Sequence, residues 1–208
     1  MVSCRRTARN PSPSRRLAAN KKFLKRASWI AAGWAFFYAL YRAYYAAGGT
    51  VGMFGTPVSE YDWRMVNAKG AAILAFVAVT PVAVLRLWHR SRARPWLLAL
   101  SWIMAVGGIT HALIGMTQRI ASLSGVYVMP LPFWRTVDRR MSDLQALLFN
   151  EPWFLIEGLL WVAIAWGGAL STSPIRWWWI GSAMAGVVIL TAVGLLSAFG
   201  VIGQMIVG

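Results

Sequence analysis

The chain has 208 residues, of which 58% are hydrophobic and only 13% are charged, and its formal net charge is +15. A soluble domain usually has about 25% charged residues, and a water-soluble chain of this length could not bury so much apolar surface, so these values exclude a soluble globular domain and favour a membrane protein. The single cysteine, Cys4, excludes an internal disulfide and a cysteine-based metal site.

Residues 1–26 form a separate basic block, with nine of the 21 Lys and Arg residues and no acidic residue. We expect a disordered cytoplasmic tail that binds anionic lipid headgroups, at roughly 1 kcal/mol for each charge near the surface. Nucleic-acid binding is the alternative interpretation of this charge. Basic segments commonly flank a first membrane span, however, so we predict no nucleic-acid partner.

Five apolar segments follow, each close to the ~20 residues that cross a bilayer core of roughly 30 Å. The second contains Pro81, which a membrane helix tolerates as a kink. The third starts with Pro95 at a favourable first-turn position. The expected fold class is all-α, a polytopic helical bundle over residues 27–208. Its predicted spans are residues 27–47, 66–87, 95–118, 152–170 and 177–199.

Basic residues are unequally distributed between the two sides of these spans. With a cytoplasmic N-terminus, the inner segments are the tail, the loop RLWHRSRAR and the stretch STSPIR, which together hold 14 of the 21 Lys and Arg residues. All six acidic residues fall on the other side or in the outer half of a span. Because Lys and Arg favour the cytoplasmic side, we predict a plasma-membrane protein with its N-terminus inside and its C-terminus outside.

Two outer segments do not have the composition of a span. Residues 48–70 are Gly-rich and predict a re-entrant or surface-lying loop. Residues 119–150 contain WRTVDRRMSDLQALLF, in which apolar residues recur at three- and four-residue steps, as in an outer amphipathic helix at the membrane interface. These apolar positions are Leu131, Trp134, Val137, Met141, Leu144 and Leu147. The alternative is that both segments simply cover helix ends.

Three spans place an ionisable side chain at one depth. At a rise of 1.5 Å per residue, Arg42, His111 and Glu157 lie roughly 6–7 Å outward of the midplane. Lys69 lies higher, at about 12 Å. Charged groups inside a membrane normally face the bundle interior and pair with each other. We therefore expect Glu157 to meet Arg42, His111 or both.

The neighbours of these charges predict an aromatic pocket that opens to the outside. Arg42 shares a helical stripe with Tyr38 and Tyr45, and His111 shares its face with glycines and Gln118. The candidate catalytic residues are Glu157 and His111. The candidate ligand-binding residues are Arg42, Tyr38, Tyr45, Lys69, Gln118, Trp153 and Trp161.

Two motifs, YALYRAYYAAGGTVGMFG and FNEPWFLIEGLLWVAIAW, resemble those of a family of small actinobacterial multi-pass membrane proteins of unknown function. Members of this family pair an aromatic helix ending in Gly-Gly-Thr-x-Gly with an acidic-Pro-Trp-Phe-Leu opening of the fourth helix. The resemblance covers about residues 30–170, and the fifth span is an addition. It implies the multi-pass topology and carries no activity.

Three function classes remain open. In the first, an outward-facing pocket binds or processes a lipid, a quinone or another amphiphile, with Glu157 and His111 as an acid/base pair and Arg42 as an anion anchor. In the second, the polar layer belongs to a proton or small-solute path. In the third, the charges are structural and the protein is a scaffold or subunit. One histidine with scattered carboxylates is a weak ligand set, so we predict no metal; the cofactor is unknown.

Overall fold

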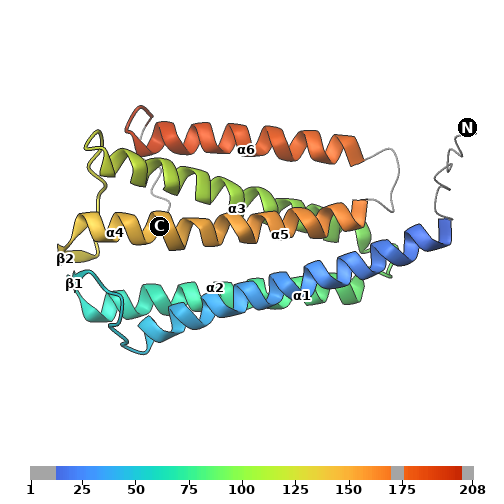
Figure 1. Ribbon diagram of the computed structural model, residues 1–208, viewed down its shortest axis with the longest axis horizontal. Coiled ribbons are helices and arrows are strands. Elements are labelled where there is room, and N and C mark those ends of the chain that lie inside the picture. The colour runs from blue at the N-terminus through green and yellow to red at the C-terminus, as the bar shows by residue number, and fades with distance from the viewer. Residues whose placement is uncertain (1–12, 170–175, 203–208) are drawn as a thin grey trace, which may run out of the picture.

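The computed structural model describes residues 13–169 and 176–202, which form a bundle of helices with one small two-stranded sheet at one end (Figure 1). The long helices are α1 (Pro13–Ala46), α2 (Glu60–Leu87), α3 (Arg94–Leu123), α5 (Glu151–Ala169) and α6 (Arg176–Ala198). The short elements are α4 (Arg139–Gln145), the π-helical turn η1 (Ala146–Asn150), and the strands β1 (Gly55–Pro57) and β2 (Trp134–Val137). The prediction of a mainly helical bundle is confirmed.

Four helical stretches within the described residues are long and apolar enough to cross a membrane. They are Glu60–Leu87, Arg94–Leu123, Arg139–Gly168 and Trp177–Ala198. The expectation of membrane-spanning helices is confirmed at this level. α1 is long enough but is not in this set. Its apolar part is rich in Tyr and Trp and contains Arg42, which lowers its mean hydropathy, so the count of five spans stays a prediction.

Two helices begin earlier in the chain than we expected. α1 starts at Pro13, so residues 13–26 are helical rather than disordered, and Leu24 is packed in the core. α2 starts at Glu60 rather than near residue 66, because the Ser59 hydroxyl accepts a hydrogen bond of 3.1 Å from the backbone N–H of Asp62. This N-cap stabilises the first turn. The loop predicted over residues 48–70 is therefore confined to its first part.

The single helix predicted between residues 131 and 147 is wrong in its first half. Trp134–Val137 forms β2, which pairs antiparallel with β1. Asp138 then caps α4, since its carboxylate accepts a hydrogen bond from the backbone N–H of Met141 at 3.0 Å. α4 continues through η1 directly into α5 as the one apolar stretch Arg139–Gly168. The β-branched and aromatic residues of WRTV favour a strand, and the cap sets where the helix can begin.

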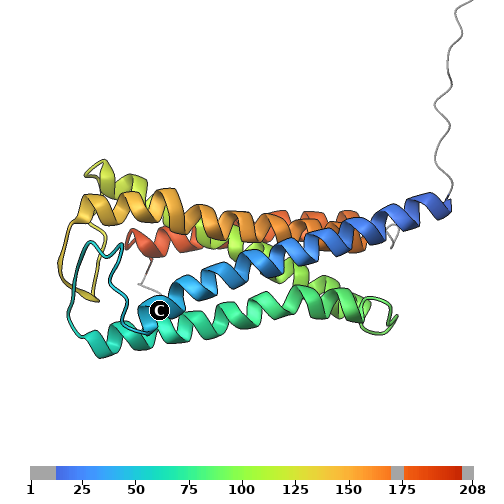
Figure 2. The ribbon, with the colours of Figure 1, turned by 60° about the horizontal axis from the view of Figure 1, so that its bottom comes forward.

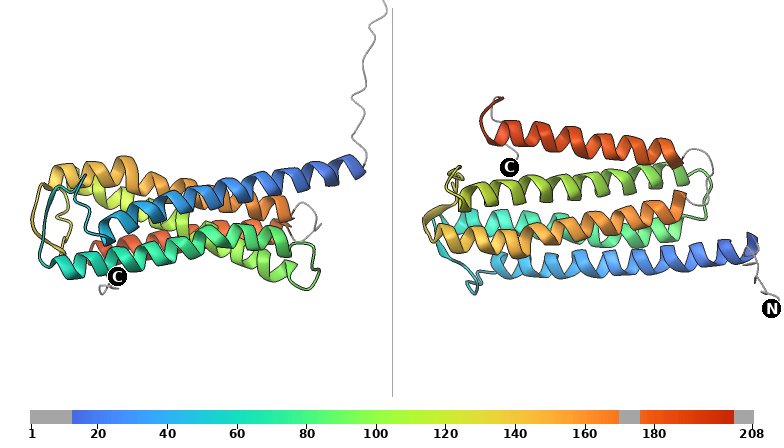
Figure 3. Two further views of the ribbon diagram at one scale, coloured as in Figure 1. Left: turned by 90° about the horizontal axis from the view of Figure 1, so that it is seen from below. Right: turned by 45° about the horizontal axis from the view of Figure 1, so that its top comes forward.

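The helices pack in a fixed order across the bundle. α2 packs on α1, α1 on α5, α5 on α3, and α3 on α6, whereas α2 and α3 are not among the closely packed pairs. Figures 2 and 3 show that α2 and α3 diverge from their shared connection toward the β1/β2 end. α3 and α5 approach closely through two glycines, because a Cβ on Gly108 would lie 3.0 Å from the Cα of Gly158.

The apolar core lies toward the end of the bundle opposite the strands. Its largest members include Trp102, Trp161 and Ile164, with Leu24 from the start of α1 and Val84 from the end of α2. The buried polar side chains Asn67, Asp143 and Glu151 belong to the β1/β2 end instead. This division places the candidate site at the β1/β2 end.

Candidate functional site

A cavity of about 160 Å³ lies at the β1/β2 end of the bundle. It is enclosed by α1, the loop after α1, the first turns of α2, the end of α3, β2, α4 and η1. The polar or aromatic residues in its lining are Tyr41, Arg42, Tyr45, Phe54, Trp63, Arg119, Trp134, Ser142, Gln145 and Asn150. The lining contains two arginines and no Asp or Glu, so its formal charge is positive.

Arg42 is held in this cavity by neutral groups. Its Nη1 donates a hydrogen bond of 3.0 Å to Oδ1 of Asn67, which is fully buried on α2. The Asn67 amide is oriented in turn by donating to the carbonyl of Trp63 at 2.8 Å. The guanidinium carbon lies 5.5 Å from the centre of the Tyr38 ring, a cation–π distance. Within the described ranges, no carboxylate lies within 4 Å of the Arg42 side-chain nitrogens.

Hydrogen bonds from α1 to η1 and to the neighbouring loop fix the aromatic wall of the cavity. The Tyr38 hydroxyl donates to Oδ1 of Asn150 at 3.3 Å, and the Tyr45 hydroxyl donates to the carbonyl of Val51 at 2.9 Å. Gln145 donates to the Tyr41 hydroxyl at 3.2 Å. The ring of Tyr41 stacks on that of Tyr38 at 5.5 Å. These contacts preorganise the wall without using the charge of Arg42.

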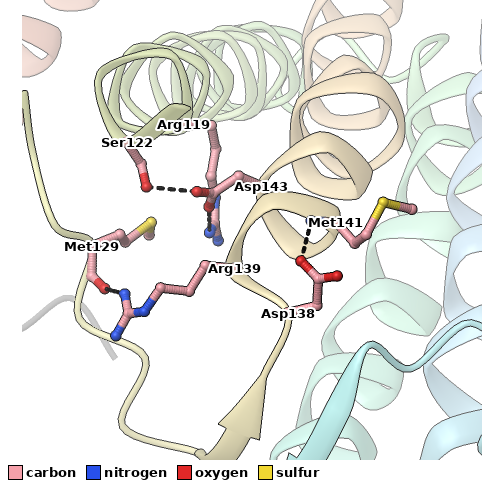
Figure 4. A network of polar contacts seen from close by, with 7 residues as sticks. All are labelled: Arg119, Ser122, Met129, Asp138, Arg139, Met141 and Asp143. Atoms are coloured by element: carbon pink, nitrogen blue, oxygen red, sulfur yellow. Dashed lines mark hydrogen bonds and ion pairs between the residues drawn. The ribbon is translucent and has the colours of Figure 1, made fainter. Parts of the chain in front are cut away.

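The second arginine of the cavity is neutralised within the protein (Figure 4). Nη1 of Arg119 donates to Oδ1 of Asp143 at 2.6 Å, and the Ser122 hydroxyl donates to Oδ2 of the same carboxylate at 2.5 Å. Asp143 is only 3% exposed, so this is a buried ion pair with a third polar partner. Because it joins the end of α3 to α4, we assign Arg119 and Asp143 a structural role.

Glu151 brings a buried carboxylate close to the cavity. It is 7% exposed and occupies the space that a side chain at Gly115 would take, since a Cβ there would overlap the Glu151 carboxylate. Oε2 of Glu151 lies 3.9 Å from Nε2 of His111 and makes no hydrogen bond within the described protein. The charges of Arg119 and Arg42 act on this carboxylate at longer range.

Glu157 does not form the ion pair that we expected. Its Oε1 accepts a hydrogen bond of 2.8 Å from Nε1 of Trp161, one turn further along α5. In the part of the chain that the structure describes, neither Arg42 nor His111 pairs with it. The predicted depth in the membrane therefore did not identify the partners of these residues. Arg42 is bonded to α2, and the carboxylate nearest to His111 is Glu151.

The other predicted ligand-binding residues lie at different distances from the cavity. Tyr45 lines it together with Arg42, and Tyr38 lies behind the wall with no exposed surface. Lys69 is exposed on α2 and Gln118 is half-buried on α3. Trp153 stacks on Trp34 with ring centres 4.0 Å apart, and Trp161 is fully buried against Glu157. Lys69, Gln118, Trp153 and Trp161 are not part of the lining.

Sequence reasoning missed the amides of the site, Asn67, Gln145 and Asn150. These residues were difficult to recognise in the sequence, because an amide carries no charge and is common in loops. One clue was available: Asn67 follows Trp63 at a helical spacing of four, which places the amide where it can bond the preceding turn.

Comparisons of the chain with protein-family models, with curated proteins and with solved structures gave no match. The family resemblance of the two motifs therefore stays a prediction, and the functional conclusion must come from the geometry of the site.

Proposed function

We propose that this protein binds the anionic headgroup of a membrane amphiphile, a phosphate or a carboxylate, in the cavity beside Arg42. The observation that carries the proposal is that Arg42 is a half-buried cation bonded only to neutral groups, in a cavity whose lining has no acidic residue. A charge in this position is costly unless an opposite charge compensates it. A guanidinium is the side chain best suited to phosphate and carboxylate groups.

The size of the cavity agrees with a headgroup. One water takes roughly 30 Å³ of liquid volume, so about 160 Å³ accommodates a group of the size of a phosphate but not an acyl chain. A quinone, which offers carbonyl acceptors without a charge, matches the arginine less well, because hydrogen bonds between charged partners are the stronger ones.

The alternative of a scaffold with purely structural charges explains part of the arrangement. The Asp143 carboxylate accepts hydrogen bonds from Arg119 and Ser122, as expected for residues with a structural role. Arg42 differs, because its guanidinium has no ion-pair partner among the described residues. The structural role therefore accounts for Arg119 and leaves the charge of Arg42 without a counterion.

The polar groups in the two halves of the bundle give less support to a proton or solute path. In the half of the bundle away from the cavity, the hydroxyls of Thr80 and Ser101 donate to the carbonyls of Phe76 and Leu97 on their own helices. A hydroxyl that is occupied by its own backbone is a poor relay. The cavity end instead holds Arg42, Asn67 and the Arg119–Asp143 pair, as a binding site requires.

The proposal is tested by titrating lipids into the purified protein in a neutral detergent while its unfolding temperature is measured. Dioleoyl phosphatidic acid and oleate provide a phosphate and a carboxylate headgroup, and dioleoyl phosphatidylcholine is the zwitterionic comparison. We expect at least one anionic lipid to raise the unfolding temperature, because binding to the folded state contributes about 2.7 kcal/mol at one hundred times the dissociation constant. The lipid that acts also tells the two headgroup chemistries apart.

Arg42→Gln should remove this stabilisation, since it keeps a hydrogen-bonding side chain but no charge. Arg64→Gln is the matched control, because Arg64 is 52% exposed on α2, pairs with Glu60 and is not part of the cavity lining. An equal response of Arg42→Gln and the unmodified protein to the anionic lipids would exclude the site.

A further inference from the structure

His111 is an exposed polar side chain on a helix that is apolar enough to span a membrane. Its side chain is 57% exposed, and α3 is one of the four candidate spans. A polar group that faces acyl chains is unfavourable unless it finds a polar partner. Its nearest acidic neighbour, Oε2 of Glu151, lies at 3.9 Å, beyond ordinary hydrogen-bond distance, and is itself unbonded within the described residues. His111 therefore has hydrogen-bonding capacity available to a ligand, whereas the Glu151 carboxylate is buried behind it.

A continuous line of ring contacts connects this position to the proposed headgroup site. The Arg42 guanidinium lies over Tyr38, Tyr38 contacts Phe154 at 5.4 Å, and Phe154 contacts His111 at 4.2 Å. Because Tyr38 belongs to α1, these contacts place His111 on the side of α3 that faces α1 and α2. α2, the neighbour of α1, diverges from α3 toward the β1/β2 end (Figures 2 and 3).

The surface of α3 next to His111 is bare. Gly107 precedes His111 by one turn on the same face, and a Cβ at Gly107 would meet no other atom within 4 Å. The cavity beside Arg42, at about 160 Å³, is too small for the chain of a lipid whose headgroup it holds. The chain of such a lipid must leave the cavity, and the ring contacts through Tyr38 and Phe154 lead from Arg42 to this exposed surface of α3.

We infer that the ligand is a lipid that enters from the side, out of the bilayer, with its acyl chain between α2 and α3 along Phe154, His111 and Gly107. This inference rests on the proposed headgroup site and adds the route and the chain. In this arrangement the exposed His111 binds the polar junction between headgroup and chain. A soluble anion of the same headgroup chemistry, in contrast, would use Arg42 alone.

Binding of dioleoyl phosphatidic acid and of glycerol 3-phosphate is measured for the unmodified protein, Gly107→Phe and Gly181→Phe. Gly181 is the matched control, because it lies on another apolar helix, α6, and a Cβ there also meets nothing within 4 Å. We expect Gly107→Phe to weaken phosphatidic acid binding at least about tenfold, because the ring occupies the space of the chain. Glycerol 3-phosphate binding should not change, and Gly181→Phe should behave as the unmodified protein.

The outcomes separate the two proposals. If Gly107→Phe binds phosphatidic acid like the unmodified protein while Arg42→Gln does not, the lateral route is wrong and the headgroup site stands. If the unmodified protein binds neither compound and does not bind oleate, the headgroup site itself is wrong.

A second measurement, in the unmodified protein, does not depend on the folding of a variant. Phosphatidic acid with a photoreactive group in the middle of its chain should cross-link to the stretch of α3 that contains Gly107 and His111. Cross-linking to α6 in equal amount would overturn the lateral route.

Discussion

Arg42 illustrates how a half-buried cation can be held inside an apolar bundle without a carboxylate. The amide oxygen of Asn67 and the face of the Tyr38 ring each contribute a partial negative charge. These partners hold the guanidinium in one orientation but do not cancel its charge. The same residue is therefore both positioned by the fold and able to attract an anion. Its closest contacts, rather than its depth in the membrane, indicate this role.

The first prediction concerns the Arg42–Asn67 contact. Asn67→Leu removes the acceptor of a buried charged donor, so it should lower the free energy of unfolding by about 1–3 kcal/mol. The double variant Arg42→Met/Asn67→Leu should lose less than the sum of the two single variants, because the stranded charge is gone. Reversible unfolding in detergent measures this coupling.

The combination of Arg42→Met with Glu157→Gln is the control for this cycle. Glu157 is bonded to Trp161 and shares no partner with Arg42, so the effects should add within about 0.5 kcal/mol. Coupling to Glu157 instead of Asn67 would show that the charged groups meet as the sequence alone led us to expect.

At the scale of the elements, the contact between α3 and α5 determines the position of Glu151 and His111. The two helices approach through Gly108 and Gly158, and the carboxylate of Glu151 fits against Gly115. Glycines at these positions allow the backbones to pack closely. A small change in this spacing would move both polar groups relative to Arg42.

Gly158→Ala tests this packing. An added Cβ would lie 2.8 Å from the backbone nitrogen of Ile109 and 3.1 Å from the carbonyl oxygen of Ala105, atoms that cannot move without moving α3. We expect a loss of about 1–3 kcal/mol in unfolding free energy from overpacking. Gly181→Ala meets open space and should be neutral or stabilising by up to about 1 kcal/mol, as is usual for Gly→Ala in a helix. Equal stability of the two variants would refute the close approach.

The elements also show how far the sequence could predict the fold. Long apolar runs predicted the helices correctly, because in a membrane every backbone group must be bonded within its own segment. The pattern over residues 131–147 failed, because strand-forming WRTV and the Asp138 cap outweighed the helical spacing. Arg42 and Tyr45 were predicted for the site and line its cavity. Asn67 and Glu151 were not assigned to it, because partner choice depends on which helices pack together.

At the scale of the whole molecule, the two ends of the bundle have different compositions. The end opposite the strands combines the apolar core with exposed basic residues, including Lys21 and Lys22 of α1 and Arg90 and Arg92 of the α2–α3 loop. The other end contains the cavity and the buried acidic groups. Since basic residues favour the cytoplasmic side, we expect the cavity end to face outward.

Single cysteines in a Cys4→Ser background test this orientation. Val128, 75% exposed near β2, and His89, exposed in the α2–α3 loop, lie at opposite ends of the bundle. A membrane-impermeant maleimide should label Val128→Cys in intact cells and His89→Cys only after permeabilisation. The reverse pattern would place the cavity at the cytoplasmic surface and exclude a ligand from the outer leaflet.

The central claim, that Arg42 binds an anionic amphiphile from the membrane, is tested most directly by native mass spectrometry of the protein purified from its own membranes. The account predicts a bound lipid with a phosphate or carboxylate headgroup on the unmodified protein and on Arg64→Gln. Its occupancy on Arg42→Gln should be lower by about tenfold or more, because a hydrogen bond to a charged group contributes about 1.5–3 kcal/mol. Equal occupancy on all three proteins, or no bound lipid on any of them, would contradict it.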